Sequence, residues 1–344
     1  MKIDLRACLA SLSALIVLVL LTSFANAAES FKDKTVRIIV GTNPGGGFDT
    51  YSRTLARSLS KQIPGGPRII VQNMPGGGFA IAMNYLYNIA KPNGRAIGAT
   101  NSGLVMKQIV KVKGLRFDMR KFGWLGSVGK ATPTCMVMAR TGIKNLDELK
   151  NAKTPVNFGS AGTLTREGPL ILRDFVGGKI NMVEGYQGTS QIRAAIQRNE
   201  VDGYCSSWES VRVRAKGMLT AKGGDKLIPI ITSGDETDPI LKGLPTFSTN
   251  IKNKEDRTAF EAWLGPYKFF RSFVTPPNTP KATLETLQVA FRKTIDDPEF
   301  RAVSKKIGIE ISYLSGPDIE KLLEQIFSIN PAAKTRLEKL IRGK

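Results

Sequence analysis

The sequence predicts an α/β protein built from two lobes. Apolar runs of strand length alternate with segments whose apolar residues recur every three or four positions, a pattern typical of helices packed on mainly parallel sheets. The chain has 344 residues, which is more than one hydrophobic core usually serves. Two strand-like runs near the front each end in three glycines, as loops at the ligand-binding edge of open α/β sheets often do.

The first 27 residues are predicted to be a secretory signal peptide. Lys2 and Arg6 precede an apolar run over residues 12–21, and Ala25-Asn26-Ala27 is a small-x-small cleavage pattern. The run is about half the length of the roughly 20 residues that span a bilayer, so an uncleaved anchor is the weaker alternative. Cys8 is not at the cleavage site, so no lipid anchor is expected. The mature protein should begin near Ala28 and be soluble outside the cytoplasm.

Two glycine-rich loops are the strongest functional signal. Residues 36–40 run into Pro44-Gly45-Gly46-Gly47-Phe48-Asp49, and residues 68–72 run into Asn73-Met74-Pro75-Gly76-Gly77-Gly78-Phe79. Glycine has no Cβ, so its N–H groups can approach a ligand at the positive end of the next helix. Both loops should face one crevice and hold one small anion. Each loop alone is equally compatible with a tight turn, and Asp49 fits a helix N-cap better than a ligand-binding group.

The first lobe continues with alternating helices and strands. Tyr51, Leu55, Leu59 and Ile63 recur every four residues and predict a helix that Pro64-Gly65-Gly66-Pro67 ends. A second helix is predicted around residues 82–89, followed by a turn at 92–94 and a strand over 96–99. That strand ends in Thr100-Asn101-Ser102, whose polar groups make Thr100 and Ser102 further candidate ligand residues.

A second unit is predicted to begin near Thr134. Residues 135–139 form a strand, Asn145-Leu146-Asp147-Glu148 resembles a capping box, and residues 156–158 form a strand that opens into a polar loop over 159–165. This loop supplies backbone donors and hydroxyls, so its candidate ligand residues are Ser160, Ala161, Gly162, Thr163 and Thr165.

The rest of the second unit again consists of a strand, a polar loop and a helix. A strand over residues 180–183 meets Gly185-Tyr186-Gln187-Gly188-Thr189, which makes Tyr186 and Gly188 candidates, although Tyr186 suits core packing equally well. A helix follows through Ile192 and Ile196. Residues 227–232 are predicted to return the chain to the first lobe, and helices are expected near 256–263, 281–295 and 318–327.

The composition argues against an enzyme. Histidine is absent, which removes Ser-His-Asp and Cys-His pairs and every metal site that needs histidine. The first glycine loop lacks the third glycine of a dinucleotide-binding loop, and neither a P-loop nor a Gly-x-Ser-x-Gly elbow is present. We therefore expect no catalytic residue, no metal and no cofactor.

Two cysteines, Cys135 and Cys205, remain after removal of the predicted signal peptide. They are too few for a structural zinc site or a disulfide framework. One bridge is feasible in an oxidising compartment, but two separately buried thiols are the favoured interpretation, because free cysteine is among the most buried residue types.

The chain is strongly basic, with a formal net charge of +21. The basic residues are scattered, and no nucleic-acid-binding signature accompanies them. The charge is interpreted as a solvated surface that at most steers anions toward the protein. Nucleic acid is not an expected partner.

An ordered set of motifs carries a family resemblance. The set comprises the two glycine loops, Lys91-Pro92-Asn93-Gly94, Asn157-Phe158-Gly159-Ser160-Ala161-Gly162, Gly185-Tyr186-Gln187-Gly188, Val201-Asp202, Gly243-Leu244-Pro245-Thr246, Thr279-Pro280-Lys281 and Asp297-Pro298-Glu299. Each motif is weak alone, but the set spans the mature chain and resembles the Bug/TctC family. Members are extracytoplasmic solute receptors of tripartite tricarboxylate transporters.

The resemblance implies a type II-like periplasmic binding protein. Its two α/β lobes would be hinged by two crossover strands and close on a small organic carboxylate, with the first-lobe glycine loops on one carboxylate and the second-lobe loops on the remainder. The implied divisions are a signal peptide over 1–27, a first lobe over 28–133 and 232–344, and a second lobe over 134–231. The implied partners are the ligand and the transporter's membrane subunits, and the receptor should be a monomer. The rival is an ABC-type or sensory receptor for an amino acid or another small anion.

The chain departs from the family pattern in the second lobe. Leu164 stands where the family's loop usually has a second glycine, Gly168 replaces a frequent histidine, and Arg166-Glu167 adds a charge pair. Arg166 is expected to pair either with a second ligand carboxylate or, by default, with Glu167 at the surface. The class of ligand is therefore better defined than its identity.

Overall fold

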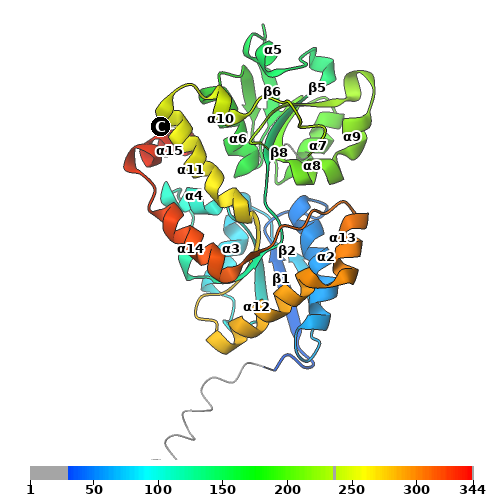
Figure 1. The fold of residues 1–344 in the computed structure, drawn as a ribbon, viewed down its shortest axis with the longest axis vertical. Helices are drawn as coiled ribbons and strands as arrows, with labels where there is room; N and C mark the ends of the chain where they lie inside the picture. Colours follow the sequence, from blue (N-terminus) through cyan, green and yellow to red (C-terminus); the bar gives the residue numbers. More distant parts are fainter. Residues whose placement is uncertain (1–29, 235–237, 343–344) are drawn as a thin grey trace, which may run out of the picture.

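The computed structural model describes residues 30–234 and 238–342, so the predicted signal peptide lies outside the described residues. The chain forms two α/β lobes, one above the other in Figure 1, each built around one sheet. This confirms the predicted fold class.

The first lobe contains a six-stranded sheet in the order β11-β4-β10-β3-β1-β2. Its strands are β1 (Thr35–Val40), β2 (Arg68–Asn73), β3 (Ala96–Asn101), β4 (Gly123–Ser127), β10 (Arg271–Thr275) and β11 (Leu314–Ser315). Its helices are α2 (Gly47–Gln62), α3 (Ala80–Asn88), α4 (Leu104–Ile109), α12 (Lys281–Asp296), α13 (Pro298–Lys306) and α14 (Gly316–Phe327). The helix predicted from the four-residue repeat is α2, whose Leu55 and Leu59 are fully buried.

The second lobe contains a five-stranded sheet in the order β7-β6-β8-β5-β9. Its strands are β5 (Pro133–Met138), β6 (Val156–Gly159), β7 (Ile180–Val183), β8 (Gly203–Ser207) and β9 (Leu227–Thr232). Its helices are α5 (Leu146–Lys150), α6 (Leu164–Asp174), α7 (Thr189–Gln197), α8 (Trp208–Arg214) and α9 (Lys216–Thr220). Asn145 caps α5 by accepting from the N–H of Glu148, as the capping-box pattern predicts.

Both sheets are mixed, whereas the sequence suggested mainly parallel pairing. In the first sheet β1 is parallel to β2 and β3, but β10 is antiparallel to β3 and β4. In the second sheet β6 is parallel to β7 and β8, but β5 is antiparallel to β8 and β9. The antiparallel partners include β5, where the chain enters the second lobe, and β10, where it has returned to the first. Their direction follows from that route, which short apolar runs do not reveal.

Two helices, α11 (Lys254–Leu264) and α15 (Pro331–Arg342), link the lobes on one side. After β9 the chain forms α10 (Phe247–Asn250) before α11, and it ends in α15. Helix α15 packs against α11 and against α6 of the second lobe, and α11 runs from one lobe toward the other (Figure 1). Arg336 of α15 pairs with Asp256 of α11. Within residues 30–234 and 238–342, no helix is long and apolar enough to cross a membrane.

Cys135 and Cys205 form a disulfide, so the favoured prediction of two separate thiols is wrong. The two residues are direct partners in the antiparallel β5–β8 pair, and their Cα atoms are 4.0 Å apart. They are separated by 70 residues in the sequence, and the sequence does not reveal the register that brings them together. Helix α6 packs closely over the bridge at Gly168, where a Cβ would lie 2.9 Å from the Cβ of Cys205.

Candidate ligand-binding site between the lobes

A cavity of about 70 Å³, here called the first cavity, lies where the glycine loops meet the second lobe. The first lobe contributes glycines, aromatic rings and three polar residues, and the second lobe contributes mainly hydroxyl, amide and small residues. The lining residues are Gly41, Thr42, Asn43, Gly46, Gly47, Phe48, Gly78, Phe79, Asn101, Ala161, Gly162, Thr163, Leu164, Thr165, Gln187, Gly188, Thr189, Ser190, Ser206, Ser207, Ser210 and Phe270.

Three substantial helices begin at this cavity. Their N-caps are Gly46 for α2, Thr163 for α6 and Gly188 for α7, and no N-cap side chain accepts a hydrogen bond from its helix. The N-terminus of a helix carries a partial positive charge and N–H groups without partners inside the helix. These three ends therefore make the first cavity favourable for a negatively charged group.

Asp49 does not cap α2 and does not line the first cavity, so its predicted N-cap role is wrong. It lies in the first turn, where its carboxylate accepts hydrogen bonds from the Gly45 N–H, Arg53 Nε and Asn73 Nδ2, each at 3.0 Å. Burial opposes ionisation, but the hydrogen bonds from Arg53, Gly45 and Asn73 outweigh it and lower the pKa of Asp49. Since Asn73 precedes the second glycine loop, Asp49 ties the two loops together.

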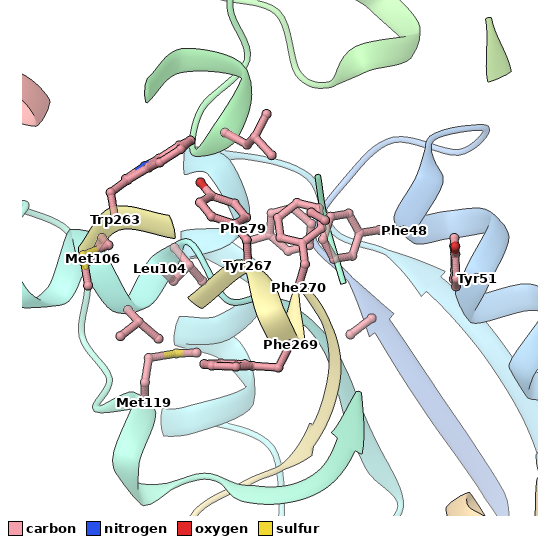
Figure 2. Close-up of a cluster of buried hydrophobic side chains, with 14 of the residues drawn as sticks. Phe48, Tyr51, Phe79, Leu104, Met106, Met119, Trp263, Tyr267, Phe269 and Phe270 are labelled. Atoms are coloured by element: carbon pink, nitrogen blue, oxygen red, sulfur yellow. The ribbon is translucent and has the colours of Figure 1, made fainter. Parts of the chain in front are cut away.

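The phenylalanine that follows each glycine triplet braces the two loops. The rings of Phe48 and Phe79 meet edge to face, with centroids 4.6 Å apart. Phe48 also contacts Phe270 at 5.0 Å, and Figure 2 shows these rings beside Tyr267 and below Trp263. A brace of packed aromatic rings fixes the loop backbones before a ligand arrives, and such preorganisation lowers the cost of binding.

The polar loop of the second lobe contacts the first lobe directly. Asn101 Nδ2, at the end of β3, donates to Thr163 Oγ1 at 2.7 Å, and Asn101 Oδ1 accepts from the Gly103 N–H. Thr165 Oγ1 accepts from the Ala161 N–H and donates to the Gly162 carbonyl, which shapes the loop internally. The Thr165 hydroxyl therefore already donates within the loop, whereas Thr163 Oγ1 only accepts in its contact with Asn101. The donors that this loop offers a ligand are thus the Thr163 O–H and backbone N–H groups.

The lobes also approach each other through glycine. A Cβ on Gly162 would lie 3.2 Å from the Cα of Gly78, and a Cβ on Gly47 would lie 2.3 Å from Ser210 Oγ. Since Gly47 and Gly78 belong to the first lobe and Gly162 and Ser210 to the second, the described arrangement is closed. The absence of side chains at these glycines permits the close approach.

A buried arginine lies behind the wall of the first cavity. Arg271 of β10 is 1% exposed, and its Nη2 donates to Ser207 Oγ at 2.8 Å and to Ser210 Oγ at 2.5 Å across the lobe boundary. Its guanidinium also lies 4.4 Å from the ring centre of Tyr51 and 5.2 Å from that of Phe270. Within the described residues the guanidinium forms no ion pair with a carboxylate, so its charge adds to the attraction for an anion.

A second cavity, of about 220 Å³, shares Gly78 and Gly162 with the lining of the first. Its lining residues are Gly76, Gly77, Gly78, Lys107, Ser160, Ala161, Gly162, Arg166, Glu184, Gly185, Tyr186 and Gln187. Tyr186, Ser160 and the first two glycines of the second loop therefore face this cavity and not the first one.

Besides Asp49, four of the candidate residues line neither cavity. Gly45 donates to Asp49, Ser102 Oγ donates to the Pro266 carbonyl at 2.5 Å, and Thr100 is fully buried beneath the site. Pro75 precedes the glycines of the second loop without lining either cavity. Polar residues at a strand end do not all face the ligand, because successive side chains point to opposite faces of the sheet.

Arg166 and Glu167 do not pair with each other, which corrects the default expectation. Arg166 Nε donates to Glu184 Oε1 at 2.8 Å, and its Nη1 donates to the Ile341 carbonyl of α15 at 2.8 Å. Glu167 is fully buried, and its Oε2 accepts from Trp263 Nε1 at 2.7 Å. Arg166 thus secures the C-terminal helix, and Glu167 lies inside the interface between the lobes.

Glu167 should make stability depend on pH. Burial raises the pKa of its carboxyl above the ordinary 4.5, and Lys107, Trp263 and Arg166 offset this only in part, with Tyr267 also nearby. The folded form therefore holds the proton more tightly than the unfolded chain, so the free energy of unfolding should fall as pH rises from 4.5 through the raised pKa.

Urea unfolding of the wild type and Glu167→Gln across this pH range isolates that contribution. The free energy of unfolding of the wild type, relative to the variant, should decrease with rising pH. A difference that does not vary with pH would mean that Glu167 has an ordinary pKa.

Several residues at or behind the two cavities were not predicted from the sequence. Ser206 and Ser207 end β8, and Ser210 lies in the following helix α8. Polar residues where a strand ends and a helix begins are the same signal that indicated the other loops. Asn101 lies between the candidates Thr100 and Ser102 but was not itself predicted to bind a ligand. Lys107 and Arg271 give no local signal, because only the fold brings them to the site.

Comparison with known proteins agrees with this geometry. The family model described as "Tripartite tricarboxylate transporter family receptor" matches residues 51–330. The chain belongs to this family. Tripartite tricarboxylate transporter receptors are solute receptors of the periplasm and not enzymes, and they bind small carboxylates and work with transporters.

Individual relatives of this receptor cover nearly its whole length. A UPF0065 protein of Bordetella pertussis is 25% identical over 320 residues, which are 90% of this chain and 91% of the relative. The periplasmic binding protein BugD has a TM-score of 0.70 at 18% identity, covering 90% of this chain and 98% of its own. MatC of Rhodopseudomonas palustris, solved with bound malate, has a TM-score of 0.67 at 20% identity, covering 90% of this chain and 99% of its own.

Proposed function

We propose that this receptor captures a small organic carboxylate in the first cavity and delivers it to the membrane subunits of a tripartite tricarboxylate transporter. The observation that carries the proposal is the convergence of the α2, α6 and α7 N-termini on one cavity between two lobes. Near a helix N-terminus a negative charge gains roughly 0.3 to 1 kcal/mol when exposed and more when partly buried. Three such ends, with Arg271 behind them, favour a carboxylate over a neutral solute.

The rival proposal is an amino-acid receptor of the ABC or sensory type. An amino acid carries an ammonium group, and a buried ammonium needs a carboxylate or several acceptors to offset its lost hydration. Among the described residues, none of the side chains that line the first cavity is acidic. The first cavity therefore favours a carboxylate without an α-amino group.

The proposal extends to the cellular location, the lobe boundaries and the oligomeric state of the receptor. We propose that residues 1–27 are removed and that the mature protein works in the periplasm, which the Cys135–Cys205 disulfide supports because disulfides persist in oxidising compartments. The proposed first lobe comprises residues 28–133 and 232–344, and the proposed second lobe 134–231. We expect a monomer that catalyses no reaction and needs neither cofactor nor nucleic acid.

A thermal-shift screen of residues 28–344 tests this function. The panel pairs each carboxylate with its amino-acid counterpart, such as succinate with aspartate and glutarate with glutamate, and adds monocarboxylates and tricarboxylates. A ligand at 100 times its Kd should add about 2.7 kcal/mol to the free energy of unfolding if it binds only the folded state. Stabilisation by amino acids alone would favour the rival, and no stabilisation by any carboxylate would contradict the proposal.

A further inference from the structure

Strand β2 is an uncovered edge of the first-lobe sheet. It stands last in the strand order, and among the described strands it pairs with β1 alone, in unbroken register from Arg68 to Asn73. No residue of β2 is buried, and Arg68, Ile70 and Gln72 are exposed. An uncovered edge strand is a template on which another strand can pair.

The main chain of β2 offers hydrogen bonds along this edge. The N–H groups of Arg68 and Met74, at its two ends, donate to main-chain carbonyls on the β1 side. Successive residues of a strand direct their main-chain groups to opposite edges, so those of Ile69, Val71 and Asn73 point outward. Among the described strands, none pairs with these outward groups.

The other edge strands of the two described sheets are protected. Strand β11 has two residues and β7 has four, while β9 contains Pro229 and has most of its residues buried. Short length, proline and burial are usual ways in which proteins prevent strand addition. Strand β2 has six residues, contains no proline and is not buried, so it is the edge best suited to accept a further strand.

A groove of about 380 Å³ lies beside β2, between this strand and α2. Its lining residues are Arg53, Ala56, Arg57, Ile69, Ile70 and Val71. The groove is therefore apolar with two arginines, and none of the described residues that line it is acidic. Arg53 is held by Asp49 and Asn73, whereas the exposed side chains of Arg57 and Arg68 form no ion pair with any described residue.

The two free arginines indicate what kind of strand fits this edge. A second copy of the chain would bring the same arginines to the shared edge, and like charges on paired strands are destabilising. An acidic strand would be attracted instead, and the formal net charge of +21 would speed its approach. Charge therefore favours an acidic partner over self-association.

We propose that β2 is a docking site for an extended acidic segment of a partner protein, which adds to the first-lobe sheet as a further strand. The main chain of the segment would pair with that of Ile69 and Val71, and its apolar side chains would enter the groove. Its acidic side chains would lie beside Arg57 and Arg68. This inference goes beyond the proposed function and does not depend on which solute the receptor binds.

The test titrates residues 28–344 with a blocked peptide of about seven alternating glutamates and valines, the usual length of a strand. Calorimetry should show one-to-one binding with a Kd below about 1 mM at low salt, weakening as salt screens the charges. The same peptide with every backbone nitrogen methylated keeps its charges but cannot donate hydrogen bonds. It should bind at least about tenfold more weakly.

Two variants locate the binding on β2. Arg57→Glu with Arg68→Glu turns two attractions into two repulsions and should weaken peptide binding roughly five- to 100-fold. Its matched control is Lys216→Glu with Lys222→Glu, which makes the same change of charge at exposed positions of the second lobe. That control should lose less than about twofold at moderate salt, because distant charges are screened.

Val71→Pro removes one outward N–H and leaves the β1 side of β2 intact, a change that edge strands tolerate. It should weaken binding roughly two- to tenfold. Urea unfolding shows whether each variant is folded. The methylated peptide needs no substitution, so it tests strand pairing even if a variant fails to fold.

The outcomes distinguish strand addition from its alternatives. Slower amide exchange at Ile69 and Val71 on addition of the acidic peptide would support the inference. Equal affinity for the methylated peptide, or equal losses in the two double variants, would mean attraction by charge alone and would overturn it. No saturable binding up to about 1 mM peptide would also overturn it. A wild-type dimer in sedimentation velocity that Val71→Pro abolishes would mean that a second copy covers the edge, contrary to the proposal.

Discussion

Replacing Gly47 by alanine is expected to weaken binding of the best carboxylate by roughly five- to 150-fold without unfolding the protein. The added methyl group would lie 2.3 Å from Ser210 Oγ and 3.4 Å from Arg271 Nη2 when the lobes are closed. Overpacking of this kind costs about 1 to 3 kcal/mol, which gives the expected range of affinity. In an open form the methyl group meets no second-lobe atom, and Gly47 does not have the positive φ that alanine would resist.

A double-mutant cycle shows whether the clash is between the lobes. Ser210→Ala removes the hydroxyl that the new methyl group would strike and leaves Ser210 Cβ at 3.4 Å, an ordinary contact. Gly47→Ala combined with Ser210→Ala should therefore bind no more weakly than Ser210→Ala alone. Gly46→Ala is the matched control, because its Cβ would meet nothing closer than 3.8 Å. Gly77 is less suitable, since its φ of +57° would strain any side chain.

Calorimetric titration of the three single variants and the double variant with the best carboxylate measures these affinities against that of the wild type. Unchanged affinity in a folded Gly47→Ala protein would contradict closure through the Gly47–Ser210 contact. The same conclusion follows if the double variant loses as much affinity as the two single variants combined.

Replacing Cys135 and Cys205 together by alanine is expected to lower the free energy of unfolding by about 4 kcal/mol in the chain-entropy account. The bridge closes a loop of 70 residues, and the stabilisation grows with the logarithm of loop length. Urea unfolding measures the change. The bridge joins β5 to β8, next to the strand that leads into the Ser160–Thr165 loop, so ligand affinity should fall much less than stability does.

The matched control is the wild type unfolded under reducing conditions, which should resemble the double-alanine variant. Two free thiols per molecule in the unfolded, unreduced mature protein would show that the bridge does not form. A loss of stability below about 1 kcal/mol would show that the bridge constrains the unfolded chain far less than its loop length implies.

The sequence predicts the parts of the fold that depend on local pattern. Helices α2 and α12 and strands β1, β6 and β7 follow from apolar periodicity and turn residues. The two glycine-rich loops and the second-lobe loops at residues 159–165 and 185–189 follow from glycine and hydroxyl clusters at strand ends. The direction of β10 and the register between Cys135 and Cys205 do not follow, because they depend on pairing between distant segments.

In the candidate site, too, the features that depend on local pattern were predicted and those that depend on tertiary packing were not. Gly46, Gly47, Gly78 and Gly162 lie at the first cavity because loops at the ends of parallel strands converge. Asp49, Arg166 and Glu167 have partners that sequence spacing did not indicate, namely Asn73, Glu184 and Trp263. Long polar side chains reach partners on other elements, so their roles depend on tertiary packing.

The central claim, that the lobes close on a small carboxylate, is tested most directly by small-angle X-ray scattering of the mature protein. The carboxylate with the largest thermal shift is added to saturation, and the radius of gyration is compared with that of the ligand-free protein. A ligand shifts such an equilibrium by its differential affinity for the two forms, and contacts from both lobes favour the closed one. We predict a smaller radius of gyration on saturation, with a curve that matches the closed arrangement described above. An unchanged radius of gyration at full saturation would contradict the account.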